Sequence, residues 1–240
     1  MINQHIVSSF DTDLEKLQTQ VLKMAGLVEA ALTDATTALD TNDVDLAEAV
    51  IKRDKQIDRI ELDLNDDVET IIALRAPMAG DLRLVLSVLK VSASLERIGD
   101  YAKNIAKRTR IIENLGVIEG STKSLKVQSR EVAKMLSMVI DAYIRRDADL
   151  AQEVIKADLE IDALYNSMVR EYLTYMMEDN RHISVCMQLH FIGKNIERMG
   201  DLVTNIAEQL IFWIEGERPS EPRPKADITT SDAQVYSQDD

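Results

Sequence analysis

Residues 95–106 have the sequence Leu-Glu-Arg-Ile-Gly-Asp-Tyr-Ala-Lys-Asn-Ile-Ala, and residues 196–207 repeat this pattern as Ile-Glu-Arg-Met-Gly-Asp-Leu-Val-Thr-Asn-Ile-Ala. Residues 43–58 match residues 147–162 in the same way. The offsets of 101 and 104 residues differ by three, which indicates a longer connection in the first half. Similar stretches at a nearly fixed spacing indicate an internal duplication, so the chain is predicted to contain two copies of one unit in tandem.

Each unit is predicted to be helical. Apolar residues recur at alternating steps of three and four positions, which places one apolar seam along a helix. One such seam is formed by Leu84, Val88, Val91, Leu95, Ile98, Ala102 and Ile105. Sandwiches and barrels need turn residues about every 8–12 positions, but Pro77 is the one proline in residues 1–216. The composition therefore excludes an all-β fold and disfavours an α/β fold.

The predicted fold is all-α, with two tandem three-helix bundles built from six long antiparallel helices. Turn and capping residues divide the chain into helices expected at 4–40, 43–75, 81–113, 121–146, 148–178 and 182–214. The three predicted segments are a first bundle at 1–116, a second bundle at 117–216 and a tail at 217–240. The tail is rich in Pro, Ser, Thr and Asp, and this composition predicts an acidic, disordered segment.

The chain carries a net charge of −14. A surface this acidic repels phosphate backbones, so nucleic acid is not an expected partner. No apolar run reaches the length of a membrane span, and residues 1–10 lack the layout of a signal peptide. A single cysteine, Cys186, cannot form an internal disulfide. These features predict a soluble cytoplasmic protein.

Each unit also repeats a set of acidic residues at helical spacing. The first unit carries Asp54, Asp58, Glu96 and Asp100, which we call the first quartet. The second unit carries Asp158, Asp162, Glu197 and Asp201, which we call the second quartet. Within each quartet, two pairs on consecutive helices have four-residue spacing, which places both members on one helical stripe. Asn104 and Asn205 extend two of these stripes by another turn.

The expected hairpins bring the two pairs of each quartet together. A hairpin centred near Ala79 sets Asp58 level with Asp100, and one centred near Arg181 sets Asp162 level with Asp201. Converging carboxylates repel one another, which favours proton uptake or a bound cation. Their oxygens suit hard metal ions such as Mg²⁺ or Mn²⁺, and clustered sites can hold several ions. Each quartet is therefore a predicted metal site.

A plainer interpretation stands beside the metal site. Acidic pairs on helices are commonly solvated faces, and Arg97 and Arg198 are available as ion-pair partners. Gly99 and Gly200 lie inside the same helices, where glycine costs roughly 1 kcal/mol relative to alanine. Their presence indicates close approach by a backbone, a ligand or a tightly packed neighbouring helix.

These motifs resemble those of the PhoU family, the phosphate-transport accessory proteins. The most specific stretches are 197–217, which begins Glu-Arg-Met-Gly-Asp and ends Phe-Trp-Ile-Glu-Gly-Glu, and 74–83, Leu-Arg-Ala-Pro-Met-Ala-Gly-Asp-Leu-Arg. Residues 24–31, Met-Ala-Gly-Leu-Val-Glu-Ala-Ala, are similar to the family as well. The resemblance covers nearly the whole predicted folded part of the chain.

The resemblance implies two three-helix bundles and multinuclear iron or zinc clusters at the eight quartet carboxylates. It also implies a homodimeric regulatory adaptor rather than an enzyme. Its expected partners are the ATPase subunit of the Pst phosphate importer and a sensor histidine kinase, with both phosphate uptake and the starvation response kept low in abundant phosphate. Family motifs often have His directly after the motif Asp, whereas this chain has Tyr101 and Leu202.

Two alternatives remain open at the level of sequence. One is a metal-free structural adaptor with the same fold and partners. The other is a carboxylate-bridged metal-cluster oxidase, which would need Glu-x-x-His pairs on its helices. The three histidines, His5, His182 and His190, have no Glu three residues before them, which weighs against the oxidase.

Overall fold

A computed structural model describes residues 2–116 and 118–217, with side chains from residue 9 onward. Residues 218–240, which make up nearly all of the predicted tail, lie outside the described part. Within that part the chain forms six α-helices, one 3₁₀ turn and no strand. The helices are α1 (Ile2–Thr41), α2 (Val44–Arg75), α3 (Ala79–Leu115), α4 (Lys123–Arg145), α5 (Ala148–Glu178) and α6 (Ile183–Glu215), with the turn η1 (Asn180–His182) before α6. The all-α prediction is confirmed.

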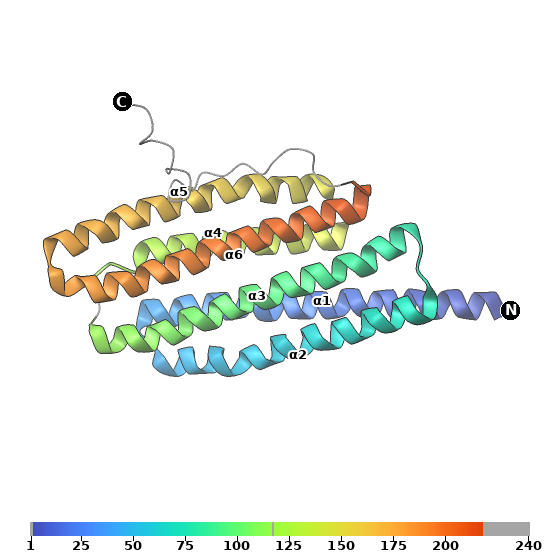
Figure 1. Cartoon of the computed structure of the whole chain (residues 1–240), viewed down its shortest axis with the longest axis horizontal. Coiled ribbons are helices and arrows are strands. Elements are labelled where there is room, and N and C mark those ends of the chain that lie inside the picture. Colours follow the sequence, from blue (N-terminus) through green and yellow to red (C-terminus); the bar gives the residue numbers. More distant parts are fainter. Residues whose placement is uncertain (1, 117, 218–240) are drawn as a thin grey trace, which may run out of the picture.

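The helices form two bundles that lie side by side along one axis (Figure 1). Helices α1, α2 and α3 pack on one another in the first bundle, and α4, α5 and α6 do so in the second. Across the interface α3 packs extensively on α6, and α1 packs on α4. The predicted pair of three-helix bundles is thus confirmed, while the exact boundary near residue 117 stays a prediction.

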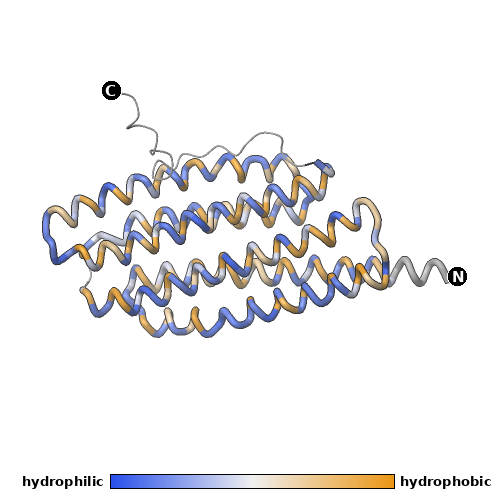
Figure 2. The backbone as a smooth tube through the Cα atoms, in the orientation of Figure 1, coloured by the Kyte–Doolittle hydropathy of each residue, from blue (hydrophilic) through white to orange (hydrophobic). Residues whose placement is uncertain are grey.

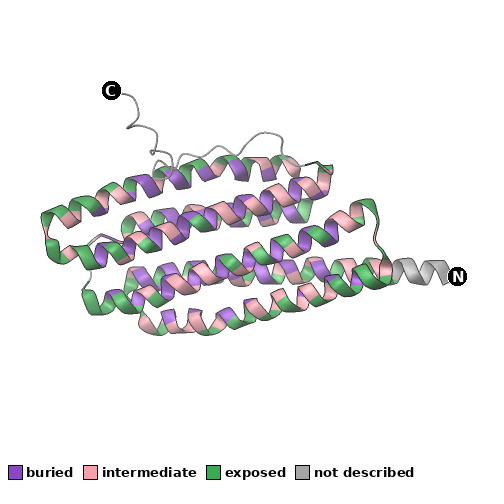
Figure 3. Cartoon of the chain, in the orientation of Figure 1, coloured by how far each residue is buried: buried purple, intermediate pink, exposed green. Residues whose placement is uncertain are grey.

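The apolar seams face the interior of the bundles. Orange and blue alternate along every helix in Figure 2, and the buried residues in Figure 3 form stripes on the sides where helices meet. The largest fully buried side chains come from both bundles: Leu17, Met24, Leu32, Ile57, Leu64, Leu95, Ile98, Ile105, Leu125, Leu136, Ile161 and Tyr172. Burial of this apolar surface is the main stabilising contribution to the fold.

Helix ends reflect the duplication. Asp43 and Asp147 occupy equivalent N-cap positions, and their carboxylates accept hydrogen bonds from the backbone N–H groups of Leu46 and Leu150 at 2.9 and 3.0 Å. Such caps satisfy donors that have no partner inside the helix.

The first hairpin is tighter than predicted. Helix α2 ends at Arg75, and its C-cap residue Ala76 adopts a left-handed conformation with φ 46°. Helix α3 already begins at Ala79 instead of residue 81. Met78 is extended and occupies the N-cap position. Gly80 and Asp81 therefore belong to the first turn of α3, where the Asp81 carboxylate complements the helix dipole. The turn is thus centred on Pro77, which the short extended segment accommodates.

Polar contacts join the two bundles near one end of the interface. The Arg108 guanidinium on α3 donates to Gln188 Oε1 on α6 at 2.6 Å and lies 4.6 Å from the centre of the Phe191 ring. Thr36 and Ser129 link α1 to α4 with an Oγ1–Oγ distance of 2.6 Å. These contacts fix how the bundles sit against each other.

The sequence predicted no membrane-spanning segment among these helices. In the described ranges, none of them combines the length and the apolar character that a membrane crossing requires.

We expect Arg108→Ala to weaken the contact between the bundles. The change removes a charged hydrogen bond and a cation–π contact, together worth about 2 kcal/mol. Urea unfolding should show this loss in the free energy of unfolding. The exposed neighbour Lys107 provides the control, and Lys107→Ala should change stability by less than about 0.5 kcal/mol. Equal stability of the two variants would contradict the role assigned to Arg108.

Candidate functional site

The first quartet assembles where α2 and α3 pack together. Asp54 is 5% exposed, and Asp58, Glu96 and Asp100 are partly buried around it. A Cβ atom at Gly99 would lie 3.0 Å from Ile57 Cδ1 and 3.8 Å from Asp54 Oδ1. The glycine therefore allows α2 to approach α3 closely and brings Asp54 to the face of α3 that carries Glu96 and Asp100.

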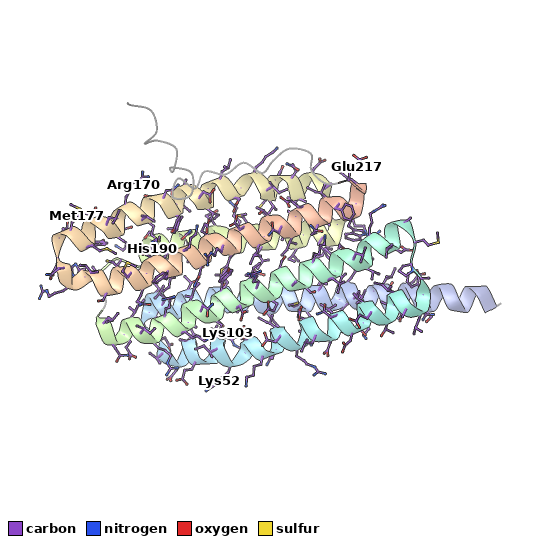
Figure 4. The ribbon with its side chains drawn as sticks, in the orientation of Figure 1. Lys52, Lys103, Arg170, Met177, His190 and Glu217 are labelled. Atoms are coloured by element: carbon purple, nitrogen blue, oxygen red, sulfur yellow. The ribbon has the colours of Figure 1, made fainter. Side chains whose placement is uncertain are left out.

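A lysine that the sequence analysis did not single out lies inside this quartet. Lys103 Nζ is 2.5 Å from Asp54 Oδ2 and 2.5 Å from Asp100 Oδ1, so one ammonium group binds a carboxylate on each helix. Lys103 is labelled in Figure 4. The other oxygen of Asp54, Oδ1, is buried and has no hydrogen-bond partner among the described residues. The sequence did contain a sign of this ion pair, because Asp100 and Lys103 are three residues apart and such residues share a helix face.

The register differs from the predicted one by about one helical turn. Asp100 shares Lys103 with Asp54, whereas the expected register set it level with Asp58. Residues 54 and 100 are equally far from Pro77 along the chain, which is the observed centre of the hairpin. The shift follows from the early start of α3 at Ala79.

The carboxylates of the first quartet perturb one another. Burial raises the pKa of Asp54, although Lys103 acts in the opposite sense. Burial, the charge of Asp100 and the charge of Asp58 raise the pKa of Glu96 to about 7. Burial by itself would lower the pKa of Lys103, but hydrogen bonds to Asp100 and Asp54 outweigh it and raise that pKa. The lysine is therefore a permanent cation in the quartet at physiological pH.

The second quartet lies between α5 and α6 and is more deeply buried. Asp158, Asp162 and Glu197 are 2, 5 and 5% exposed, and Asp201 is partly buried. A Cβ atom at Gly200 would lie 2.8 Å from Asp158 Oδ1, so this glycine makes room for a carboxylate. Both glycines thus mark close packing of neighbouring helices, and the second also forms a cradle for an acidic group.

A different lysine reaches the second quartet. Lys194 Nζ lies 3.0 Å from Glu197 Oε2 and 5.0 Å from the centre of the Tyr165 ring. Position 194 precedes Glu197 by one turn, so this ammonium approaches the glutamate end of the quartet.

The two arginines predicted as ion-pair partners do not contact the quartets, whereas the role of the two asparagines stays a prediction. Arg97 and Arg198 are exposed and form no ion pair within the described part of the chain. Asn104 and Asn205 are partly buried beside the quartets. The charge partners are Lys103 and Lys194 instead, because residues directly after Glu96 and Glu197 point away from the stripe that carries the carboxylates.

The fit of a metal ion differs between the quartets. No group of three or more His, Cys, Asp or Glu side chains is arranged to hold a metal ion in the described part of the chain. In the first quartet, the Lys103 ammonium occupies the position between Asp54 and Asp100, so the donors as arranged do not fit a metal. The second quartet consists of buried carboxylates, the type of donor that hard cations bind, but as arranged these side chains do not form a metal site either.

The histidines that the oxidase alternative would need form no Glu-x-x-His pair with the quartet carboxylates. His190, labelled in Figure 4, is partly buried, and burial lowers its pKa. Its ring centre lies 6.0 Å from that of Tyr165. His182 lies in η1, with Nδ1 3.4 Å from the backbone oxygen of Tyr175. The side chain of His5 is outside the described residues.

A pocket of about 530 Å³ lies between the bundles, away from both quartets. Its lining includes Arg83, Arg146, Trp213 and the acidic residues Asp11, Glu15 and Asp81. The Arg146 guanidinium lies 5.2 Å from the centre of the Trp213 ring. The lining contains both positive and negative groups, so its charge selects neither anions nor cations.

Comparison with known proteins identifies the relatives of this chain. The family model described as the PhoU domain matches residues 21–109 and 125–210, one match in each bundle. The phosphate-specific transport system accessory protein PhoU homolog of Zymomonas mobilis is 43% identical over 228 residues, covering 95% of this chain and 96% of the relative. The accessory protein PhoU of Escherichia coli is 39% identical over 216 residues, covering 90 and 89%.

Solved structures show the same relationship. The crystal structure of PhoU from Pseudomonas aeruginosa is similar with a TM-score of 0.84 and 38% identity, covering 87% of this chain and 100% of that one. The phosphate transport system regulatory protein PhoU from Streptococcus pneumoniae has a TM-score of 0.81 and 27% identity, covering 88 and 100%.

We expect Glu96→Gln to stabilise the protein at alkaline pH. The pKa of Glu96 is raised to about 7 in the folded state. The protonated Glu96 carboxyl therefore contributes to stability below the pKa that this group has in the unfolded chain, and the contribution is lost as the pH rises through about 7. The variant should unfold with a free energy about 1 kcal/mol higher near pH 8, a value reduced for the partial exposure of Glu96. The difference should vanish near pH 4.

Chemical denaturation in the presence of a metal chelator measures this difference across the pH range. Glu113→Gln, at an exposed position of the same helix, is the control and should show no pH-dependent gain. A gain at Glu96 that is equal at both pH values would mean that the ionisation of this buried carboxyl is not its cause.

Proposed function

Because this chain belongs to the PhoU family, we propose that it is the adaptor that lowers phosphate uptake through the Pst importer when phosphate is plentiful. The family consists of regulatory accessory proteins and not of enzymes, so the oxidase alternative is set aside. The observation that carries the proposal is the match of both repeats over nearly the full length of the relatives.

The proposed partners follow from this role and from the charge of the chain. The adaptor would act in the cytoplasm as a homodimer and dock on the ATPase subunit of the importer and on a sensor histidine kinase. A net charge of −14 favours docking on a basic patch of a partner, because complementary potentials speed association and select partners. The same charge argues against nucleic acid.

We place the proposed metal ion in the second quartet. Asp158, Asp162, Glu197 and Asp201 would hold it, and iron or zinc is the metal implied by the family resemblance, with Mg²⁺ and Mn²⁺ chemically possible. When bound, the metal would supply positive charge between α5 and α6. The residues themselves already bring the acidic stripes of both helices together at Gly200.

A metal-free adaptor is the second candidate. The observation that favours it is that each quartet contains a lysine in contact with its carboxylates, Lys103 in the first and Lys194 in the second. Internal ammonium groups neutralise part of the buried negative charge without any ion from solution.

Deletion of the gene should raise phosphate uptake and phosphate-starvation gene expression in abundant phosphate, because the brake on both is removed. Uptake of labelled phosphate and a reporter for a starvation-induced promoter measure the two outcomes. Expression of the full chain should restore both to low values. Normal uptake and reporter activity in the deletion strain would refute the proposed regulation.

Asp201→Asn should weaken metal binding by at least about tenfold, because it removes a charged oxygen donor from the second quartet. Zn²⁺ titration of the purified protein by calorimetry measures the change. The matched control is Glu153→Gln, at an exposed position of α5, which should bind Zn²⁺ as the unchanged chain does. Unaltered affinity in Asp201→Asn would favour the metal-free adaptor.

A further inference from the structure

The two repeats place their cations differently. In the first quartet, Lys103 Nζ is 2.5 Å from one oxygen of Asp54 and 2.5 Å from one oxygen of Asp100. The Lys103 side chain is 21% exposed, and the Asp54 side chain is 5% exposed. The ammonium group is therefore held at the seam between α2 and α3 and not on the outer surface.

The matching position of the second repeat has no positive charge. An offset of 101 residues relates Lys103 to Thr204, which is fully buried. Its hydroxyl donates to the backbone oxygen of Asp201 at 2.8 Å. Conversely, Lys194 corresponds to Ala93, an exposed position of α3. The two lysines thus arose at different places in the repeats and approach opposite ends of the quartets.

The position of Lys103 Nζ coincides with the place that a metal ion would need. Metal ions bind carboxylate oxygens at about 2.0–2.6 Å, and the ammonium nitrogen lies at the upper end of this range from two oxygens at once. A metal between Asp54 and Asp100 and the ammonium of Lys103 cannot occupy that space together. Binding of a metal would require the lysine to leave a site where both of its carboxylate partners hold it.

We infer that Lys103 is the resident cation of the first quartet and excludes metal ions from it, so that only the second of the two quartets is open to a metal ion. The inference deepens the proposed metal site and rests on it only for the second bundle. The first bundle then keeps α2 and α3 joined without any ion from solution. Its acidic stripes serve as an internal ion-pair network in place of a metal centre.

The buried oxygen of Asp54 indicates what removal of the lysine would expose. Asp54 Oδ1 has no hydrogen-bond partner among the described residues, and Asp54 Oδ2 accepts from Lys103. Without the ammonium, the buried Asp54 carboxylate would lose its cation and keep the repulsive charges of Asp58 and Asp100 nearby. Lys103→Met should therefore create a metal site where the unchanged chain has none.

The test compares the amount of Zn²⁺ bound by the full chain, by Lys103→Met and by the control Lys107→Met, after loading with Zn²⁺ and dialysis. Lys107 lies one turn away at an exposed position of α3. Elemental analysis should find at least one more Zn²⁺ per chain in Lys103→Met than in the other two proteins. Addition of Asp54→Asn to Lys103→Met should abolish the gain.

Two outcomes would overturn the inference: equal Zn²⁺ content in all three proteins, or loss of Zn²⁺ from the otherwise unchanged chain on Asp100→Asn. Absence of Zn²⁺ from the unchanged chain together with a gain in Lys103→Met would instead count against the proposed second-bundle site and support the role of Lys103. The exclusion of metal by Lys103 and the metal site of the second bundle can therefore be refuted independently of each other.

A second measurement uses the unchanged chain and does not depend on the folding of a variant. Reductive methylation followed by peptide mass spectrometry reports the accessibility of each lysine. Lys103 should be modified at least about tenfold more slowly than exposed Lys107, and saturating Zn²⁺ should leave its rate unchanged. A rise in Lys103 modification on addition of Zn²⁺ would show that the metal displaces the ammonium, which contradicts the inference.

Discussion

The Lys103 ammonium binds the carboxylates of Asp54 and Asp100 across the seam between α2 and α3, and this contact supplies the counter-charge of the acidic stripe in the first bundle. A carboxylate that is 5% exposed, as Asp54 is, cannot keep its charge in an apolar seam without a cation close by. The apolar residues on either side bring the helices together, so the acidic stripe between them must be neutralised by protons, a metal ion or a lysine.

The duplication shows that the negative charge of an acidic stripe between packed helices can be neutralised in more than one way. Both repeats keep two acidic pairs and a glycine at the same place on the seam, at Gly99 and Gly200. Each glycine allows a neighbouring helix to approach closely, with Ile57 against the first and Asp158 against the second. Since the lysines occupy unrelated positions in the two repeats, the acidic stripes and glycines were retained while the source of positive charge changed.

This division between the repeats fits a regulatory protein. The Lys103 ammonium lies between two carboxylates of the first quartet. The second quartet, which Lys194 contacts at Glu197, combines deeper burial with a cradle for a carboxylate at Gly200. The helices α3 and α6, which carry half of each quartet, also pack on each other across the interface between the bundles. A change in the charge of the second quartet would therefore act on a helix that contacts both bundles.

The amino-acid sequence alone determined the helices, their number and the duplication. Helical periodicity is a local property, so steps of three and four residues along 84–105 identify a seam without knowledge of its partner. The four-residue spacing of the quartet pairs likewise placed them on stripes before any packing was known. The end of the first hairpin was less certain in the sequence, because Gly80 and Asp81 suit both a turn and the first turn of a helix.

Only the tertiary structure decided which cation meets each quartet. Arg97 is adjacent to Glu96 in sequence, yet it is exposed and lies off the acidic stripe. Lys103 reaches Asp54 because the hairpin turns at Pro77 and Gly99 lets the helices approach closely, which together set their register and rotation. Register and rotation depend on contacts between residues distant in sequence, so no local pattern could place that ammonium between two carboxylates.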